Sequence, residues 1–123
     1  RLIIKDYINM PLCMAAADLV ITRCGASTLA ELEAVGRGAI LIPSPMVAEN
    51  HQYHNGMVLQ NANAGFVFEE KNLQENTIID KISELIQNPE SLEILSSNSA
   101  KLHISDTSQR VLNALKPLIT MHN

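Results

Sequence analysis

The sequence has 123 residues, of which 46% are hydrophobic and 18% are charged, as expected for one small globular domain. Its 9 basic and 13 acidic residues give a net charge of -4 at pH 7, without the positive excess that nucleic-acid binding requires. Aromatic residues make up 3% and tryptophan is absent, which disfavours an aromatic platform for stacking bases or sugars.

The two cysteines, Cys13 and Cys24, are too few for a disulfide framework or a structural zinc site, and they fit a reducing, cytoplasmic environment. No apolar run reaches the roughly 18 residues that a transmembrane helix needs, and the sequence has no signal-peptide pattern. The sequence opens on Arg1 and an apolar run typical of a strand already in progress. We therefore expect a fragment of a longer protein.

Short apolar runs bounded by polar or turn residues are typical of buried parallel strands. Such runs occur at Leu2 to Ile4, Leu19 to Thr22, Ala39 to Ile42 and Gly65 to Phe68. The segments between them include two with helical spacing, over residues 26–35 with Gly36 as C-cap and over residues 51–62. This alternation predicts an α/β fold with a Rossmann-like parallel sheet flanked by helices.

After Phe68 the pattern is helical, and capping signals predict three closing helices that cover one face or edge of the sheet. The first follows a capping box at residues 72–75, and the second begins at Asn88-Pro89. The third is predicted to open at residues 106–109.

The loop after the second strand is the first candidate binding site, because open α/β sheets bind ligands beyond the carboxyl ends of their strands. Its sequence is Thr22-Arg23-Cys24-Gly25-Ala26-Ser27-Thr28, whose small residues let a ligand approach the backbone. Free N–H groups at the following helix start favour a phosphate or pyrophosphate, and Arg23 adds a positive charge. The loop matches neither a dinucleotide fingerprint nor a P-loop.

The same loop also has a purely structural interpretation, as a tight turn with Thr28 capping the helix and Glu31 completing a capping box. Alternatively, Glu31 accepts two hydrogen bonds from a ribose diol, as acidic residues do in nucleotide-binding folds. Cys24 at a helix start is a candidate for a lowered pKa, but no neighbouring base is indicated, which disfavours a nucleophilic role.

The loop after the third strand, at residues 43–50, is the second candidate site. Two prolines stiffen it, and polar residues follow it at His51-Gln52-Tyr53-His54-Asn55. This set suits a neutral polyhydroxyl ligand, and a solvated first helical turn is the alternative. His51 and His54 have a spacing found among metal ligands, but no further ligand completes a site, so neither a metal nor another cofactor is predicted.

Residues 7–68 resemble the MurG family of peptidoglycan glycosyltransferases, which transfer N-acetylglucosamine from UDP-N-acetylglucosamine to lipid I to form lipid II. The resemblance is carried by residues 15–32, 40–45 and 50–55, in the order and spacing of that family. It implies the later part of the C-terminal, donor-binding half of a GT-B fold, as one domain over residues 1–123. The acceptor half, which binds lipid I and is implied to supply the general base, lies outside this chain. No catalytic residue is therefore expected here.

The resemblance also implies roles for individual residues. The turn at Gly25, Ala26, Ser27 and Thr28 faces the donor pyrophosphate, and Glu31 holds the ribose. Gln52, with His51, reads the sugar hydroxyls, and Asn55 lies in the same motif. The backbone of the segment containing Ile8 and Met10 contacts uracil.

The family further implies peripheral association with the inner face of the bacterial cell membrane, and no nucleic-acid partner. Gly38 stands where the family has a proline, which predicts a looser turn before the third strand. Two alternatives remain open, namely another GT-B enzyme that uses a nucleotide sugar and a non-catalytic α/β module that binds a partner through apolar helices.

Overall fold

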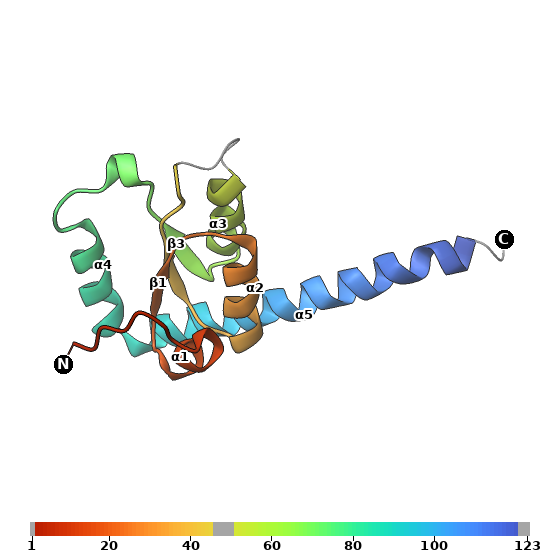
Figure 1. Cartoon of the computed structure of the whole chain (residues 1–123), viewed down its shortest axis with the longest axis horizontal. Helices are drawn as coiled ribbons and strands as arrows, with labels where there is room; N and C mark the ends of the chain where they lie inside the picture. Colours follow the sequence, from red (N-terminus) through yellow and green to blue (C-terminus); the bar gives the residue numbers. More distant parts are fainter. Residues whose placement is uncertain (1, 46–50, 121–123) are drawn as a thin grey trace.

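The computed structural model describes residues 2–45 and 51–120, which form a parallel three-stranded sheet with helices packed against both faces (Figure 1). The elements in chain order are α1 (Met10–Ala16), β1 (Val20–Thr22), α2 (Ala26–Val35), β2 (Ala39–Leu41), α3 (His51–Asn61), β3 (Gly65–Val67), the 3-10 helix η2 (Glu70–Asn72), α4 (Thr77–Ile86) and α5 (Pro89–Thr120). The predicted α/β fold with a parallel sheet is confirmed.

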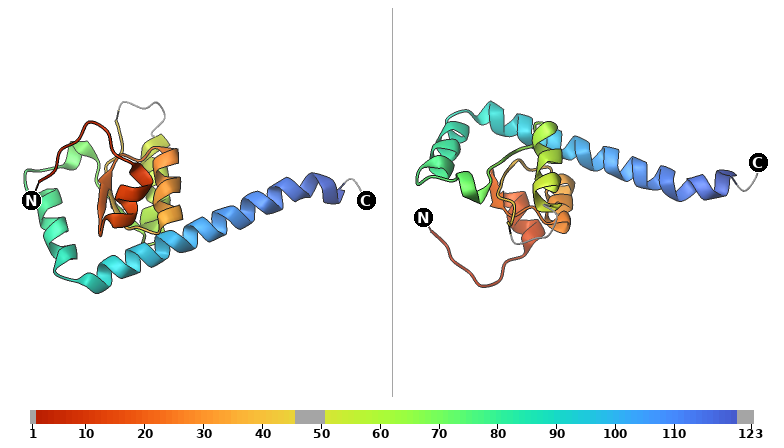
Figure 2. Two further views of the ribbon diagram at one scale, coloured as in Figure 1. Left: turned by 60° about the horizontal axis from the view of Figure 1, so that its bottom comes forward. Right: turned by 90° about the horizontal axis from the view of Figure 1, so that it is seen from above.

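The sheet has the order β1-β2-β3, and the alternating side chains of β2 supply two hydrophobic cores. Ala39 and Leu41 face the core formed with α1, α2 and α3, whereas Ile40 faces the core formed with α4 and the start of α5. Figure 2 shows these helices on opposite sides of the sheet. Because both faces of the sheet are covered, the apolar runs of the central strand are continuous.

The α2 helix ends as predicted. Gly36 adopts the left-handed conformation with φ of 73°, and its N–H donates to the carbonyl of Leu32 at 2.8 Å. A glycine is suited to this position because it has no Cβ to oppose a positive φ. The turn therefore ends α2 and directs the chain into β2.

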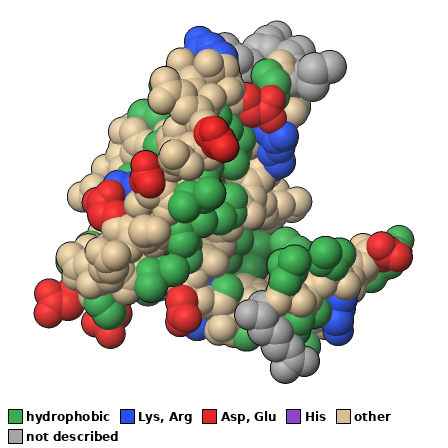
Figure 3. Space-filling view, turned by 90° about the vertical axis from the view of Figure 1, so that its left-hand side faces the viewer, with side chains coloured by type: hydrophobic (Ala, Val, Ile, Leu, Met, Phe, Trp, Pro, Cys, Tyr) green, Lys and Arg blue, Asp and Glu red, His purple; other side chains and the backbone are tan. Residues whose placement is uncertain are grey.

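The first predicted strand, Leu2 to Ile4, is wrong. These three residues have no strand pairing, and their exposed fractions are 84%, 65% and 83%. A strand requires a hydrogen-bonding neighbour, and β1, an outer strand of this sheet, pairs only with β2 among the described residues. Figure 3 shows hydrophobic side chains gathered on the side of the molecule that lies to the left in Figure 1.

The helix α1 was not predicted from the sequence, and two helix starts differ from their predicted positions. Asn9 caps α1 by accepting the N–H of Leu12 at 3.1 Å, with a proline in the first turn. The predicted capping box at residues 72–75 starts at the last residue of η2 and lies ahead of α4, which begins at Thr77. No helix opens at residue 106, because α5 continues unbroken from Pro89 to Thr120 and extends beyond the sheet (Figure 2).

Gly38 does not loosen the turn before β2. An added Cβ would lie 2.5 Å from the Cβ of Leu95, so α5 packs directly against this glycine. The N–H of Gly38 also donates to the hydroxyl of Ser96 at 3.3 Å, a bond that proline cannot make. The close approach of α5 therefore explains why glycine occupies this position.

Candidate functional site

The carboxyl ends of the three strands lie side by side, as the candidate site requires. Thr22 pairs with Leu41, and Leu41 pairs with Val67, so the loops that follow all leave from one edge of the sheet. The α2 and α3 helices begin beside this edge (Figure 1). Hydrogen bonds of α3 side chains with Cys24 and Ser44 show that the loops after β1 and β2 lie together.

The N-terminus of α2 is formed by Gly25, and the predicted cap at Thr28 is wrong. Gly25 is the N-cap, and no side chain caps the helix within the described residues. Leu29 is the first residue whose N–H donates back into the helix, to the carbonyl of Gly25 at 3.0 Å. The N–H groups of Ala26, Ser27 and Thr28 therefore precede the helical hydrogen-bond ladder and face the helix start.

Because α2 begins after Gly25, Glu31 does not complete a capping box with Thr28. Glu31 is half-buried in the second turn of the helix, and its carboxylate has no hydrogen-bond or ion-pair partner within residues 2–45 and 51–120. At the start of α2, the positive end of the helix dipole and the three N–H groups favour binding of an anion.

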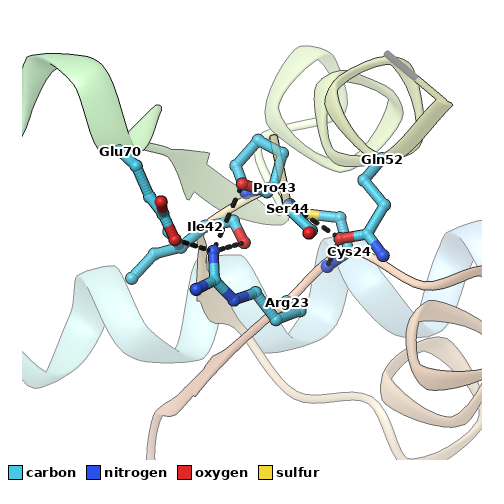
Figure 4. A network of polar contacts seen from close by, with 7 residues as sticks. All are labelled: Arg23, Cys24, Ile42, Pro43, Ser44, Gln52 and Glu70. Atoms are coloured by element: carbon cyan, nitrogen blue, oxygen red, sulfur yellow. Dashed lines mark hydrogen bonds and ion pairs between the residues drawn. The ribbon is translucent and has the colours of Figure 1, made fainter. Parts of the chain in front are cut away.

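Gln52 joins the two candidate loops (Figure 4). Its Oε1 accepts the N–H of Cys24 at 3.2 Å and the N–H of Ser44 at 2.9 Å. One turn later on α3, the side-chain amide of Asn55 donates to the carbonyl of Cys24 at 3.1 Å. Two predicted site residues thus hold the loop that leads into α2.

Arg23 extends across the ends of the strands. Its Nη1 donates to the carbonyls of Ile42 and Pro43 at 3.4 and 3.3 Å and forms an ion pair with Glu70 (Figure 4). The guanidinium charge is therefore partly balanced by a carboxylate, and its side chain links the ends of β1 and β2 to η2. In this geometry Arg23 is directed at protein acceptors at the sheet edge.

Cys24 is fully buried directly before the α2 N-cap. Burial raises the pKa of its thiol to about 11, because the thiolate is poorly solvated, and nearby Arg23 opposes this effect only in part. A nucleophilic role for Cys24 is disfavoured by this pKa.

We expect iodoacetamide at pH 8 to label the exposed Cys13 readily and Cys24 at least tenfold more slowly, because raising a thiol pKa from 9.0 to about 11 lowers its thiolate fraction strongly. Labelling of Cys24 should increase as the pH rises toward 11. Mass spectrometry of timed samples measures both rates, and the chain unfolded in guanidinium chloride is the control. Equal rates at the two cysteines of the folded chain would contradict the buried thiol.

The remaining predicted residues do not all lie at this edge. His51 is exposed at the start of α3, whereas α1, which begins at Met10, lies at the lower end of the sheet in Figure 1, opposite the loops. Ile8 and Met10 are therefore not brought to the loops in this structure. The described part of the chain contains no group of three His, Cys, Asp or Glu side chains arranged to hold a metal ion.

Two hollows differ in their position relative to the loops. A cavity of about 850 Å³ lies at the amino ends of the strands, lined by residues such as Leu19, Ile82 and Leu92. A smaller cavity of about 150 Å³ lies at the exit of β2, between Ser44, Tyr53 and Glu70. Only the smaller one is at the edge where open α/β sheets bind ligands.

Three residues that were not predicted also contribute to this edge, namely Ser44, Gly56 and Glu70. An added Cβ at Gly56 would lie 3.1 Å from both the Sγ of Cys24 and a methyl carbon of Val67. Glycine inside a helix was the available signal, since it costs helix stability and so indicates a close approach. No local pattern predicts the long-range contacts of Ser44 and Glu70.

Comparison with known proteins shows the family of this chain. Residues 1–111 match the glycosyltransferase family 28 C-terminal domain. A relative from Rickettsia massiliae is 48% identical over 93 residues, which cover 76% of this chain and 25% of the relative. A relative from Thermoanaerobacter sp. is 42% identical over 110 residues, covering 89% of this chain and 30% of the relative. Both are named UDP-N-acetylglucosamine--N-acetylmuramyl-(pentapeptide) pyrophosphoryl-undecaprenol N-acetylglucosamine transferase.

The crystal structure of Acinetobacter baumannii MurG has the same fold, with a TM-score of 0.68 and 23% sequence identity. The match covers 85% of this chain and 32% of that one, so the chain spans about a third or less of the proteins it resembles. The family match extends over nearly all of the described strands and helices and includes both loops of the candidate site. The chain therefore belongs to the glycosyltransferase family 28 C-terminal domain family.

Proposed function

We propose that this chain supplies part of the donor site of a glycosyltransferase that moves N-acetylglucosamine from UDP-N-acetylglucosamine to lipid I, giving lipid II. The names of the Rickettsia and Thermoanaerobacter relatives support this chemistry. The observation that carries the proposal is the uncapped N-terminus of α2, which lies at the carboxyl edge of the sheet beside a glycine. A nucleotide pyrophosphate is the anion that best suits such a site.

In the proposed site the N–H groups of Ala26, Ser27 and Thr28 bind the pyrophosphate, and Gly25 allows it to approach the backbone. The carboxylate of Glu31, which has no hydrogen-bond or ion-pair partner within residues 2–45 and 51–120, accepts hydrogen bonds from the ribose hydroxyls. The sugar is read by His51, Gln52 and Asn55 at the start of α3.

One further assignment rests on the sequence resemblance. Arg23 is proposed to contribute positive charge near the phosphates, although its guanidinium is engaged by carbonyls and by Glu70.

The proposed reaction inverts the anomeric carbon. A hydroxyl of the acceptor attacks that carbon as its bond to the phosphate oxygen breaks, and negative charge develops on the β-phosphate of the departing UDP. The α2 dipole and its fixed N–H groups stabilise this charge without reorganising during the step. The proton of the attacking hydroxyl goes to a general base, which we assign to the part of the longer protein outside this chain.

We further propose that the chain is the later part of the donor-binding domain, and that an acceptor domain of the longer protein binds lipid I. Because that acceptor is linked to a lipid, the full-length protein is proposed to act as a peripheral protein at the inner face of the bacterial membrane. Within residues 2–45 and 51–120, every helix is too short or too polar to cross a membrane.

Replacing Glu31 with alanine in the full-length protein tests the proposal. We expect at least a tenfold loss of affinity for UDP, because two hydrogen bonds to a charged carboxylate are removed, each contributing about 1.5–3 kcal/mol. Isothermal titration calorimetry with UDP and with 2′-deoxy-UDP measures this effect. The parent protein should prefer UDP, and the Glu31→Ala variant should bind both ligands alike.

Glu84→Ala is the matched control, because Glu84 is an exposed glutamate on α4, on the other face of the sheet. It should leave both affinities unchanged. Equal UDP affinity in the Glu31→Ala variant and its parent would reject the ribose contact, and absence of binding to the parent protein would reject the proposed function.

A further inference from the structure

The loop before α2 is held by α3 through both backbone polar groups of one residue. The N–H of Cys24 donates to Gln52, and the carbonyl of Cys24 accepts from Asn55. Gln52 and Asn55 are three residues apart and so lie on the same face of α3. Cys24 immediately precedes the Gly25 N-cap, so these two bonds set the path by which the chain enters α2.

Packing supports the same attachment. Gly56 follows Asn55 on α3, and an added Cβ there would lie 3.1 Å from the buried Sγ of Cys24. The α3 backbone therefore lies directly against Cys24. Two hydrogen bonds and one close contact come from a single turn of α3.

The second bond of Gln52 determines which way its amide faces. Its Oε1 accepts the N–H groups of both Cys24 and Ser44, and a flipped amide would place its own NH₂ group against two donors. Figure 4 shows the amide nitrogen turned away from both of these contacts. Within residues 2–45 and 51–120 this nitrogen has no acceptor, so donation is the interaction that Gln52 has left for a ligand.

We infer that Gln52 and Asn55 are positioning residues that hold the Cys24 backbone and thereby orient the first N–H groups of α2, and that Gln52 contacts the donor sugar only as a hydrogen-bond donor. The inference rests on the proposed function for the identity of the ligand. The ligand group that Gln52 recognises must then be an acceptor oxygen of the sugar. The attachment of the loop itself exists without any ligand.

Two substitutions of Gln52 in the full-length protein separate these roles. Gln52→Glu keeps an oxygen that accepts both backbone N–H groups but removes the NH₂ group. Gln52→Met keeps a similar volume and removes both functions. Hydrogen exchange of the Cys24 and Ser44 amides reports on the loop attachment, and calorimetric titration with UDP-N-acetylglucosamine reports on the ligand contact.

For Gln52→Glu we expect exchange of both amides to stay within about threefold of the parent, while affinity for UDP-N-acetylglucosamine falls at least tenfold. For Gln52→Met we expect exchange of both amides to accelerate at least tenfold and affinity to fall as well. Asn55→Ala should shift the carbonyl carbon resonance of Cys24 and weaken binding, although the NH₂ group of Gln52 is retained.

Gln60 provides a matched control on the same helix, because its Oε1 accepts the N–H of Val67 at 2.8 Å. Gln60→Met should accelerate exchange of Val67 and leave affinity for the sugar nucleotide unchanged. Unchanged exchange of Cys24 and Ser44 in Gln52→Met would overturn the attachment, and full affinity in Gln52→Glu would overturn the donor contact. If the parent protein does not bind UDP-N-acetylglucosamine, the proposed function and the ligand contact fail, whereas the exchange results still decide the attachment.

Discussion

Replacing Leu32 with alanine is expected to lower the free energy of unfolding by about 2–5 kcal/mol, the range found for leucine truncations in well-packed cores. Leu32 is completely buried in the core between the sheet and helices α1, α2 and α3. Its carbonyl also accepts the N–H groups of Gly36 and Arg37 and the hydroxyl of Ser99. The backbone around the cavity is therefore held by three hydrogen bonds and has little freedom to collapse into it.

Denaturation of the 123-residue chain in urea, followed by circular dichroism, measures this effect. Leu12→Ala is the matched control, because Leu12 is also helical but its exposed fraction is 68%. Its free energy of unfolding should change by no more than about 0.5 kcal/mol. A similar small change for Leu32→Ala would show that this core is not packed as described.

Replacing Gly25 with serine should leave stability almost unchanged and yet abolish most donor binding in the full-length protein. Gly25 has φ of -65° and ψ of 144°, which any residue adopts, and an added Cβ would meet nothing within 4 Å. Serine is a favourable N-cap, so we expect stability to stay within about 0.5 kcal/mol. Its hydroxyl would accept an N–H of the first turn of α2 and occupy the space that we assign to the pyrophosphate.

Thermal unfolding and titration with UDP-N-acetylglucosamine measure the two effects, and we expect at least a tenfold loss of affinity. Gly25→Ala adds a methyl group without the hydroxyl. A loss in both variants would indicate that space for the ligand is decisive, whereas a loss in serine alone would indicate competition for the N–H groups. Parental affinity in Gly25→Ser would contradict the pyrophosphate site.

The sequence was sufficient for the elements whose stability is local or whose pattern is strong. The apolar runs at residues 19–22, 39–42 and 65–68 lie within one residue of β1, β2 and β3, because helices bury β2 completely and pack against side chains of the two neighbouring strands. The α2 helix has its predicted bounds, since Gly36 provides the left-handed residue at its end. The order of these elements was enough to predict the α/β fold and to indicate the strand ends as the place for a site.

Tertiary contacts decided the features that depend on residues far apart in the sequence. The run at Leu2 to Ile4 has strand composition, but it forms no strand because no neighbour among the described residues pairs with it. Capping residues near position 106 did not start a new helix, because a cap acts only where the preceding helix ends. The need for glycine at position 38 arises from α5, which lies almost 60 residues later in the sequence.

In the candidate site, too, some features were predictable from the sequence and others depend on tertiary contacts. Its residue types were evident from the sequence, since small residues before a helix and polar residues after a strand indicate an anion and a polyhydroxyl ligand. The sequence did not reveal that Gln52 joins Cys24 to Ser44, or that Arg23 pairs with Glu70. The physical reason is that parallel strands bring together loops separated by crossover helices, so the partner of each polar group is chosen only when the sheet assembles.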